Sequence, residues 1–280
     1  MTAAASQLFI AQPSISLAIS EMEDYYGVKL FDRISRKLYL TENGRRALQY
    51  ARHIIDLLDE MEQGVRDVDA MGRLKVGTSI TIGTYLLPGY IKRLKQQYPA
   101  LKVEASIANS ETIEQQILDN EIDVGIIEGV AHSHFILSES FAGDRLAFIC
   151  PAGHEFAGRT LEELAEVRNQ DFILREKGSA GREIFDGILA AQELNVRPIW
   201  QSASNQVILQ GVKAGLGISI LPYFLVRQGI REGELAEFRI KGLALNRKYS
   251  VIYHKNKFLP RSARTLMELC KEENGTARGL

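Results

Sequence analysis

Hydrophobic and polar positions in the first forty residues alternate as expected for two short helices and a β-hairpin. Residues 2–10 are rich in alanine and predict a first helix. A second helix is expected from Ser14 to Tyr26, with Pro13 in its first turn and Gly27 at its end. Residues 30–40 carry basic residues between apolar ones and fit a small β-wing, so the region predicts a winged helix-turn-helix. The second helix should bury one apolar face, formed by Ile15, Ala18, Ile19 and Met22.

A long helix is predicted next, with Thr41 as its N-cap and its end near Gly72. Apolar residues step along it by four and three positions, through Ala47, Ala51, Ile54, Leu58, Met61, Val65 and Val68. Such a heptad seam is typical of helices that pair with each other. The alternative is that the stripe packs on its own domain. We favour pairing, because a long helix between two domains has little else to cover it. The predicted dimerisation residues are Ile54, Leu58, Met61 and Val65.

From Leu74 onward the pattern changes to strands alternating with helices, which predicts an α/β architecture. A second set of elements begins near Leu146. The predicted strands are 74–77, 102–108, 124–127, 196–200, 217–221 and 249–254. The predicted helices are 85–98, 111–120, 181–191, 205–214 and 261–271, with a helix start near Ile82 after the first strand.

Composition is that of an ordinary two-domain globular protein, with 280 residues, 45% hydrophobic and 25% charged. The longest apolar runs are far too short to span a membrane, and no secretion signal precedes them, so we expect a cytoplasmic protein with no membrane partner. Two cysteines form neither a disulfide framework nor a CxxC metal pair. The net charge is −1, yet residues 29–46 hold six basic and two acidic residues, which suits a phosphate-facing patch.

Two sets of motifs, one in residues 4–44 and one in residues 85–222, stand in the order and at the spacing of a known family, so that the chain resembles the LysR-type transcriptional regulators along its whole length. The DNA-binding signature of that family is matched by Ala4-Ala5, Leu8, Gln12-Pro13-Ser14-Ile15-Ser16, Glu23, Gly27, Leu30-Phe31-Asp32-Arg33 and Leu40-Thr41-Glu42-Asn43-Gly44. Its effector domain is matched by Tyr85-Leu86-Leu87-Pro88, Glu121-Ile122-Asp123-Val124-Gly125-Ile126 and Ala214-Gly215-Leu216-Gly217-Ile218-Ser219-Ile220-Leu221-Pro222. The branch that it resembles contains regulators of sulfur and cysteine metabolism or of carbon fixation.

The resemblance implies a sequence-specific DNA-binding regulator that is modulated by a small anionic metabolite, with no other cofactor. Its partners would be double-stranded promoter DNA and further copies of itself, as a homodimer or homotetramer. The fold class would be α/β, with a winged helix-turn-helix followed by a two-lobed effector domain of the type 2 periplasmic-binding-protein kind. The implied domains are 1–43 (DNA binding), 44–72 (linker helix) and 73–280 (effector domain, with lobe I at 73–146 and 249–280 and lobe II at 147–248).

Two departures from the family pattern stand out. The family has a further helix before the alanine pair, whereas this chain starts at Met1. Losing that helix would remove several buried side chains worth roughly 1.5–3 kcal/mol each. We therefore expect either that Met1 is not the native start or that DNA binding is crippled. In addition, Leu17 stands where the family often has arginine.

Contacts to DNA are assigned by position. A recognition helix reads base edges from near its N-terminal end, and basic wing residues suit phosphate or minor-groove contacts. For Gln12 and Ser14 the alternative is that they only cap the helix. The predicted base-reading residues are Gln12, Ser14, Ser16 and Ser20. The predicted wing contacts are Lys29, Arg33, Arg36 and Lys37.

An effector site is expected in a cleft between the lobes, where the family binds its ligand against hydroxyl residues after the first strand. Hydroxyl groups precede predicted helices on both sides, and free N–H groups there favour an anion. The alternative is that these hydroxyls only cap helices. The predicted effector residues are Thr78, Ser79, Thr81, Glu128, Gly129, Ser179, Arg182, Ser202 and Ser204.

Neither a catalytic set nor a metal site is expected. Cys150 and His154 lie close in sequence, but no third group orients them as nucleophilic catalysis requires. His132 and His134 lack a third ligand. Two other classes remain as alternatives: a solute-binding receptor without DNA binding, and an enzyme built on the same two lobes. Residues 2–46 speak against the receptor.

Overall fold

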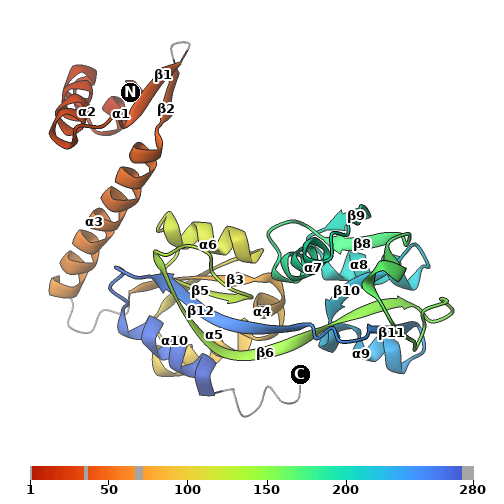
Figure 1. The fold of residues 1–280 in the computed structure, drawn as a ribbon. Helices are drawn as coiled ribbons and strands as arrows, with labels where there is room; N and C mark the ends of the chain where they lie inside the picture. The colour runs from red at the N-terminus through yellow and green to blue at the C-terminus, as the bar shows by residue number, and fades with distance from the viewer. Residues whose placement is uncertain (1, 35–36, 67–71, 273–280) are drawn as a thin grey trace. The chain divides into compact units, whose positions relative to one another are not determined.

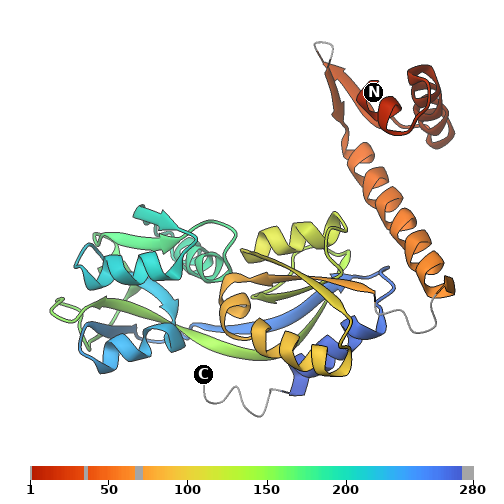
Figure 2. The ribbon, with the colours of Figure 1, turned by 180° about the vertical axis from the view of Figure 1, so that it is seen from behind.

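The computed structural model describes residues 2–34, 37–66 and 72–272. The chain forms two compact units, Met1–Val68 and Asp69–Leu280. Figures 1 and 2 show each unit from two sides. The first unit contains α1 (Thr2–Gln7), α2 (Gln12–Tyr26), β1 (Phe31–Ile34), β2 (Lys37–Leu40) and α3 (Glu42–Arg66).

Helix α2 begins at Gln12, two residues earlier than predicted. Its N-cap residue is Ala11, which makes no side-chain capping bond, so the alternative that Gln12 or Ser14 caps the helix is wrong. Gly27 ends the helix as predicted, because its φ of 67° lies in the left-handed region that glycine tolerates best.

The predicted apolar face of α2 is only partly buried. Ile15 and Ile19 are half-buried, whereas Ala18 and Met22 are exposed, so that part of the prediction is wrong. The elements described beside α2 are a six-residue helix and a hairpin of two four-residue strands, too small to cover a whole helix face. The one α2 side chain that is buried belongs to Glu23.

A tight junction leads from the hairpin into α3. The Thr41 hydroxyl accepts a hydrogen bond from the Gly44 N–H at 2.9 Å, which confirms the predicted cap. The same hydroxyl donates to the Lys29 carbonyl at 2.6 Å. Gly44 is required here, because a Cβ would lie 2.0 Å from the Leu30 carbonyl oxygen. Helix α3 ends at Arg66, and residues 67–71, where its last turn was predicted, lie outside the described residues.

The second unit is built on an eight-stranded mixed sheet, with the order β4-β3-β5-β12-β6-β11-β7 and with β10 also paired to β6. Strands β3, β4 and β5 are parallel, whereas β12 runs antiparallel to both β5 and β6. A separate parallel pair, β8 and β9, adjoins Ile218 through an isolated bridge. The strands are β3 (Arg73–Ser79), β4 (Lys102–Ala108), β5 (Val124–Glu128), β6 (Ile136–Pro151), β7 (Thr160–Leu161), β8 (Phe172–Arg175), β9 (Pro198–Ser202), β10 (Ser219–Pro222), β11 (Leu235–Ile240) and β12 (Asn246–His254).

The helices of this unit agree with the predicted ones in most places. The predicted helix 85–98 is α5, which runs from Leu87 to Gln97 with a proline in its first turn, and the helix predicted to start near Ile82 is α4, which runs from Ile80 to Tyr85. The sequence patterns did not predict α9, β8, β11 or most of β6. The helices are α4 (Ile80–Tyr85), α5 (Leu87–Gln97), α6 (Ser110–Leu118), α7 (Ala180–Ala191), α8 (Asn205–Lys213), α9 (Tyr223–Arg231) and α10 (Arg261–Glu272), with a 3₁₀ turn η1 (Leu164–Val167).

Buried side chains separate this unit into two lobes. The cores of the first lobe draw on residues 74–141 and 249–270. Those of the second lobe draw only on residues 146–245. Strands β6 and β12 run from one lobe into the other (Figure 1). The α/β class with two lobes, predicted from the sequence, is therefore confirmed.

Candidate functional site

A buried carboxylate ties α2 to the residues that lead into β1. Glu23 Oε1 accepts hydrogen bonds from the backbone N–H groups of Leu30 (2.8 Å) and Phe31 (3.2 Å). Glu23 Oε2 accepts one from Lys29 Nζ at 2.5 Å. The Lys29 bond, followed by the backbone N–H groups, lowers the pKa of the Glu23 carboxyl below its ordinary value. The contacts of Glu23 were missed, because its match to the family signature does not show which groups its carboxylate meets.

The predicted DNA contacts lie on this unit as follows. Gln12, Ser14 and Ser20 are exposed along α2, and Gln12 Nε2 donates to the Ser16 hydroxyl at 2.8 Å. Lys29 is held by Glu23, a contact that the charge pattern did not indicate. Arg33 and Lys37 are placed on β1 and β2 by their backbone, and their side chains lie outside the described part, as does all of Arg36.

The linker helix exposes its predicted seam within this single chain. Ile54, Leu58 and Met61 are 67%, 50% and 57% exposed. The side chain of Val65 lies outside the described residues. An exposed apolar stripe of this kind is a feature of surfaces that pack against a partner.

Three hydroxyl side chains in the first lobe are buried without a hydrogen-bond partner. Thr78 and Ser79 end β3, and Thr81 lies in α4, with exposed fractions of 0%, 1% and 3%. Their oxygen atoms make no hydrogen bond within the described part of the chain. Ser79 is the N-cap residue of α4, yet its side chain makes no capping bond. Leaving a buried hydroxyl unpaired costs roughly 1–3 kcal/mol, so capping does not account for these three residues.

The two lobes touch beside these hydroxyls. Ser79 pairs with Ala108 in the parallel ladder, and α6 starts two residues after Ala108. The Glu111 N–H donates to the Gly178 carbonyl of the second lobe at 3.1 Å. Gly178 allows this approach, because a Cβ there would lie 2.4 Å from a Glu111 carboxylate oxygen.

Two further contacts join the lobes. His132 Nε2 lies 2.9 Å from Glu183 Oε1 of α7. The Tyr85 ring meets the Phe224 ring edge-on, with centroids 5.2 Å apart. The predicted residue Gly129 lies on the same junction, since a Cβ on it would come within 3.0 Å of the Ala180 Cβ.

Hydroxyls of the second lobe are used differently. Ser179 accepts from the Arg182 N–H at 3.3 Å and caps α7, and Ser204 accepts from the Val207 N–H and caps α8. Ser202 accepts from the Ser204 N–H at 3.0 Å. The capping interpretation describes the contacts of Ser179 and Ser204, whereas Ser202 is the last residue of β9 and caps no helix. The Arg182 guanidinium is also engaged, by Asp186, the Arg175 carbonyl and Gln201.

A buried charge cluster that the sequence did not predict stands where β5, β6 and β12 meet. Arg247 is bound to Asp144 by two hydrogen bonds of 2.6 and 2.8 Å, and it lies 3.4 Å from Glu128 Oε1. That Glu128 oxygen has no hydrogen-bond partner in the described structure. Burial alone would lower the pKa of the Arg247 guanidinium, but the charges of Glu128 and Asp144 outweigh it and raise the pKa.

Cys150 and His154, which lie close in sequence, do not form a catalytic pair. Burial raises the pKa of the Cys150 thiol to about 11, so the group stays protonated, and His154 contacts Gln170 instead. The described side chains hold no group of three or more His, Cys, Asp or Glu arranged for a metal ion. Within residues 2–34, 37–66 and 72–272, no helix combines the length and apolar character needed to cross a bilayer.

Comparison with known families gives two matches that cover most of the chain. Residues 1–45 match the bacterial regulatory helix-turn-helix protein model of the lysR family. Residues 69–275 match the LysR substrate binding domain.

Comparison with individual proteins agrees with these matches. The chain is 34% identical to the HTH-type transcriptional regulator YeiE of Escherichia coli (strain K12), over 98% of this chain and 92% of that protein. It is 30% identical to the HTH-type transcriptional regulator CysL of Bacillus subtilis (strain 168), over 90% and 85%. The regulatory domain of Synechocystis PCC6803 CcmR, solved in complex with 2-PG, superposes with a TM-score of 0.65 at 25% identity, over 72% of this chain and 97% of that one.

Proposed function

Because the chain belongs to the LysR family of bacterial transcriptional regulators, we propose that it binds promoter DNA and responds to a small anionic metabolite held at the junction of its two lobes. Its relatives are regulators and not enzymes, and the helix-turn-helix match disfavours a solute-binding receptor without DNA binding. The family and branch predicted from the sequence are confirmed.

One observation carries the effector proposal: Thr78, Ser79 and Thr81 are buried hydroxyls without partners, next to the contacts that join the lobes. Hydroxyl groups donate well to an anion, and each neutral contact is worth about 0.5–1.5 kcal/mol. The related CcmR domain was solved with the anion 2-PG, which supports a ligand of this charge. Glu128, Gly129, Ser179, Arg182, Ser202 and Ser204 complete the proposed effector region.

Thermal shift tests the effector proposal directly. The melting temperature of the full chain should rise with the concentration of one anion from a panel of sulfate, thiosulfate, phosphate, O-acetylserine and small organic acids, because a ligand of the folded state stabilises it by mass action. In a Ser79→Ala, Thr81→Ala double variant the apparent Kd for that anion should rise about five- to 160-fold. Thr112→Ala, which removes an exposed hydroxyl from the same lobe, is the matched control. An unchanged Kd in the double variant would place the site elsewhere.

For DNA, we propose that Gln12, Ser14, Ser16 and Ser20 read bases and that Lys29, Arg33, Arg36 and Lys37 contact the backbone. Footprinting should show an altered sequence preference for Ser16→Ala. Arg36→Ala should instead weaken binding to every sequence alike, with a shallower dependence on salt. If Arg36→Ala changes the sequence preference and Ser16→Ala does not, the two assignments are reversed.

Self-association is proposed to run through the exposed seam of α3. Replacing Leu58 and Met61 with aspartate places charges in the apolar contact, and light scattering should then report monomers. The same replacement at Tyr50, an exposed residue of α3 outside the seam, serves as control. A double variant that keeps the parent mass would show that the seam does not pair protomers.

A further inference from the structure

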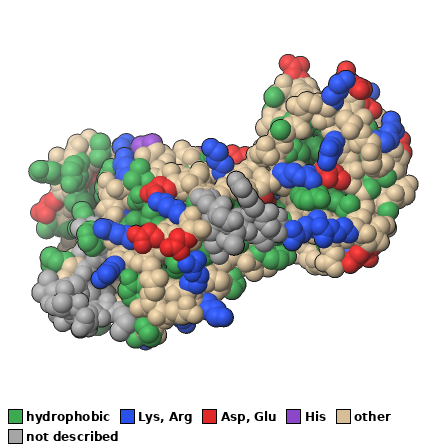
Figure 3. Space-filling model, turned by 90° about the horizontal axis from the view of Figure 1, so that it is seen from below, with side chains coloured by type: hydrophobic (Ala, Val, Ile, Leu, Met, Phe, Trp, Pro, Cys, Tyr) green, Lys and Arg blue, Asp and Glu red, His purple; other side chains and the backbone are tan. Residues whose placement is uncertain are grey.

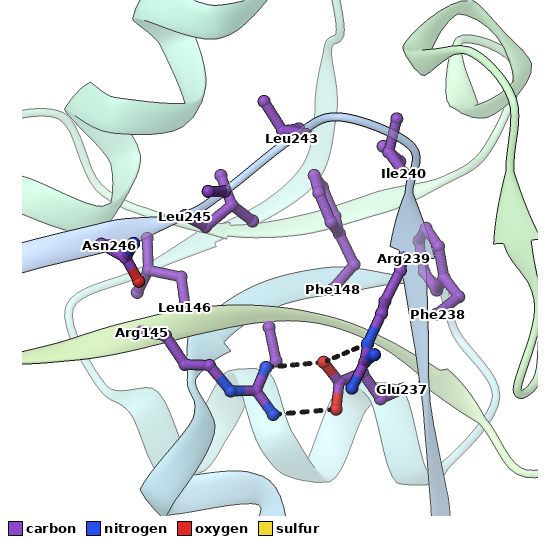
Figure 4. A pocket seen from close by; sticks show the side chains of 12 residues that line it. Arg145, Leu146, Phe148, Glu237, Phe238, Arg239, Ile240, Leu243, Leu245 and Asn246 are labelled. Atoms are coloured by element: carbon purple, nitrogen blue, oxygen red, sulfur yellow. Dashed lines mark hydrogen bonds and ion pairs between the residues drawn. The ribbon is translucent and has the colours of Figure 1, made fainter.

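A cavity of about 230 Å³ lies in the second lobe, and none of the residues that line it belongs to the proposed effector region (Figure 4). It forms where strands diverge. Strand β11 pairs with β6 as far as Phe238 opposite Phe148, and then turns to pair with β7 at Arg239. The chain returns to β6 at Leu245, whose carbonyl accepts from the Leu146 N–H at 2.8 Å. The cavity fills the gap between β6, β11 and the residues 243–246 that follow β11.

One side of the cavity is apolar. The side chains there are almost entirely buried and belong to the core of the second lobe: Leu146, Phe148, Phe238, Ile240 and Leu245. An apolar cavity of about 150 Å³ is enough to bind benzene. The volume observed here therefore has room for one ring or a short acyl chain.

The other side of the cavity is charged, and its basic side chains outnumber its acidic ones. Arg145 holds Glu237 through two hydrogen bonds of 2.6 and 3.1 Å, and its guanidinium also lies over the Tyr223 ring. Arg239 reaches the same carboxylate only at 3.7 Å, and it is 71% exposed. Glu237 is the single acid among the lining residues, so two guanidinium groups share one carboxylate. Figure 3 shows basic side chains interleaved with hydrophobic ones on this lobe, where α9 and β11 lie.

We propose that this cavity is a second ligand site, which takes a small carboxylic acid with an apolar body. The apolar body lies between the diverging strands, against Phe148 and Leu245, and the carboxylate pairs with Arg239. A fully hydrated inorganic anion does not fit this surface. The free energy lost when it gives up water against leucine and phenylalanine side chains exceeds the free energy gained by pairing with one exposed arginine. The site is thus distinct in ligand chemistry from the hydroxyl cluster of the first lobe.

Calorimetric titration of the full chain tests the proposal, with benzoate and hexanoate as probes and benzyl alcohol as the neutral match for benzoate. Both acids should bind, and benzyl alcohol should bind about ten-fold more weakly because it cannot form the charge-assisted bond. Arg239→Gln should raise the Kd for benzoate about ten-fold. Arg197→Gln removes an exposed arginine of the same lobe away from the cavity and should leave that Kd unchanged.

A second variant separates this site from the proposed effector region. Ser79→Ala, Thr81→Ala should keep the parent Kd for benzoate, and sulfate should not compete with benzoate. The proposal is wrong if neither acid binds at millimolar concentration. It is also wrong if benzoate binding is lost in the hydroxyl variant while Arg239→Gln leaves it intact, since benzoate would then occupy the effector region.

Discussion

The two lobes place the same residue types before their helices and use them in different ways. In the second lobe, Ser179 and Ser204 accept hydrogen bonds from the first turns of α7 and α8, so their hydroxyls serve the backbone. In the first lobe, Ser79 occupies the equivalent N-cap position of α4, but its hydroxyl, like those of Thr78 and Thr81, makes no hydrogen bond within the described part of the chain. A hydroxyl before a helix is therefore not a ligand contact by position alone. What distinguishes the candidates is a buried oxygen without a partner.

The largest expected effect concerns the charge cluster beside the hydroxyls of the first lobe. Arg247→Met should destabilise the second unit by roughly 3–5 kcal/mol, because it leaves the buried carboxylates of Asp144 and Glu128 without their counter-charge. Urea unfolding measures this, and Arg197→Met, at an exposed position, should change stability by less than about 0.5 kcal/mol. A loss below about 1 kcal/mol for Arg247→Met would mean that the cluster is well hydrated.

Replacing a serine that caps a helix should lower the free energy of unfolding more than replacing Ser79, which makes no capping bond. Ser179→Ala and Ser204→Ala should each cost about 1 kcal/mol, as loss of an N-cap hydroxyl usually does. Ser79→Ala should cost less than about 0.5 kcal/mol, since no bond is lost. Thermal or urea unfolding of the three variants makes the comparison, which breaks down if Ser79→Ala is as destabilising as the other two.

For anion binding the expectation is the opposite: a hydroxyl without a partner should contribute to affinity and little to stability. Thr78→Val keeps the shape of the side chain and removes an unpaired buried hydroxyl, so the free energy of unfolding should stay equal or rise by up to about 1 kcal/mol. The apparent Kd for the effector anion should rise about two- to ten-fold. Thermal shift with and without the anion records both quantities. A variant that loses stability and keeps its affinity would show that Thr78 has a structural partner.

Ser202→Ala should have the smallest effect. Its hydroxyl accepts one bond from the Ser204 N–H at a partly exposed position, so both stability and the Kd for the anion should stay within about 0.5 kcal/mol of the parent. A clear loss of anion binding in this variant would show that Ser202 contacts the ligand directly and does more than line the proposed effector region.

Local signals explain what the sequence predicted well. Thr41 and Gly27 act through bonds to residues a few positions away, and β4 was predicted with both of its ends. The predicted effector residues include the three unpaired hydroxyls, but nothing in the sequence separates Ser79 from Ser179, because the difference lies in the neighbours that folding brings. Likewise, Arg247 stands between Asn246 and Lys248 in the sequence and looks solvated, and its partner Asp144 is 103 residues away. Pairing over such a separation leaves no trace in a local pattern.

The course of β6 and β12 has a consequence for how this chain can be cut. The chain leaves the first lobe along β6 and returns along β12, and the two crossing points are neighbours, joined by the bond from the Leu146 N–H to the Leu245 carbonyl. The second lobe is therefore a topological insertion between two adjacent strands, with its own ends side by side and both of its cores drawn from residues 146–245. Segments of this kind can be excised or permuted with little damage to their host. A fragment of residues 145–246 should fold alone, and a short linker from residue 144 to residue 247 should leave the first lobe with its strand order β4-β3-β5-β12-β6 intact.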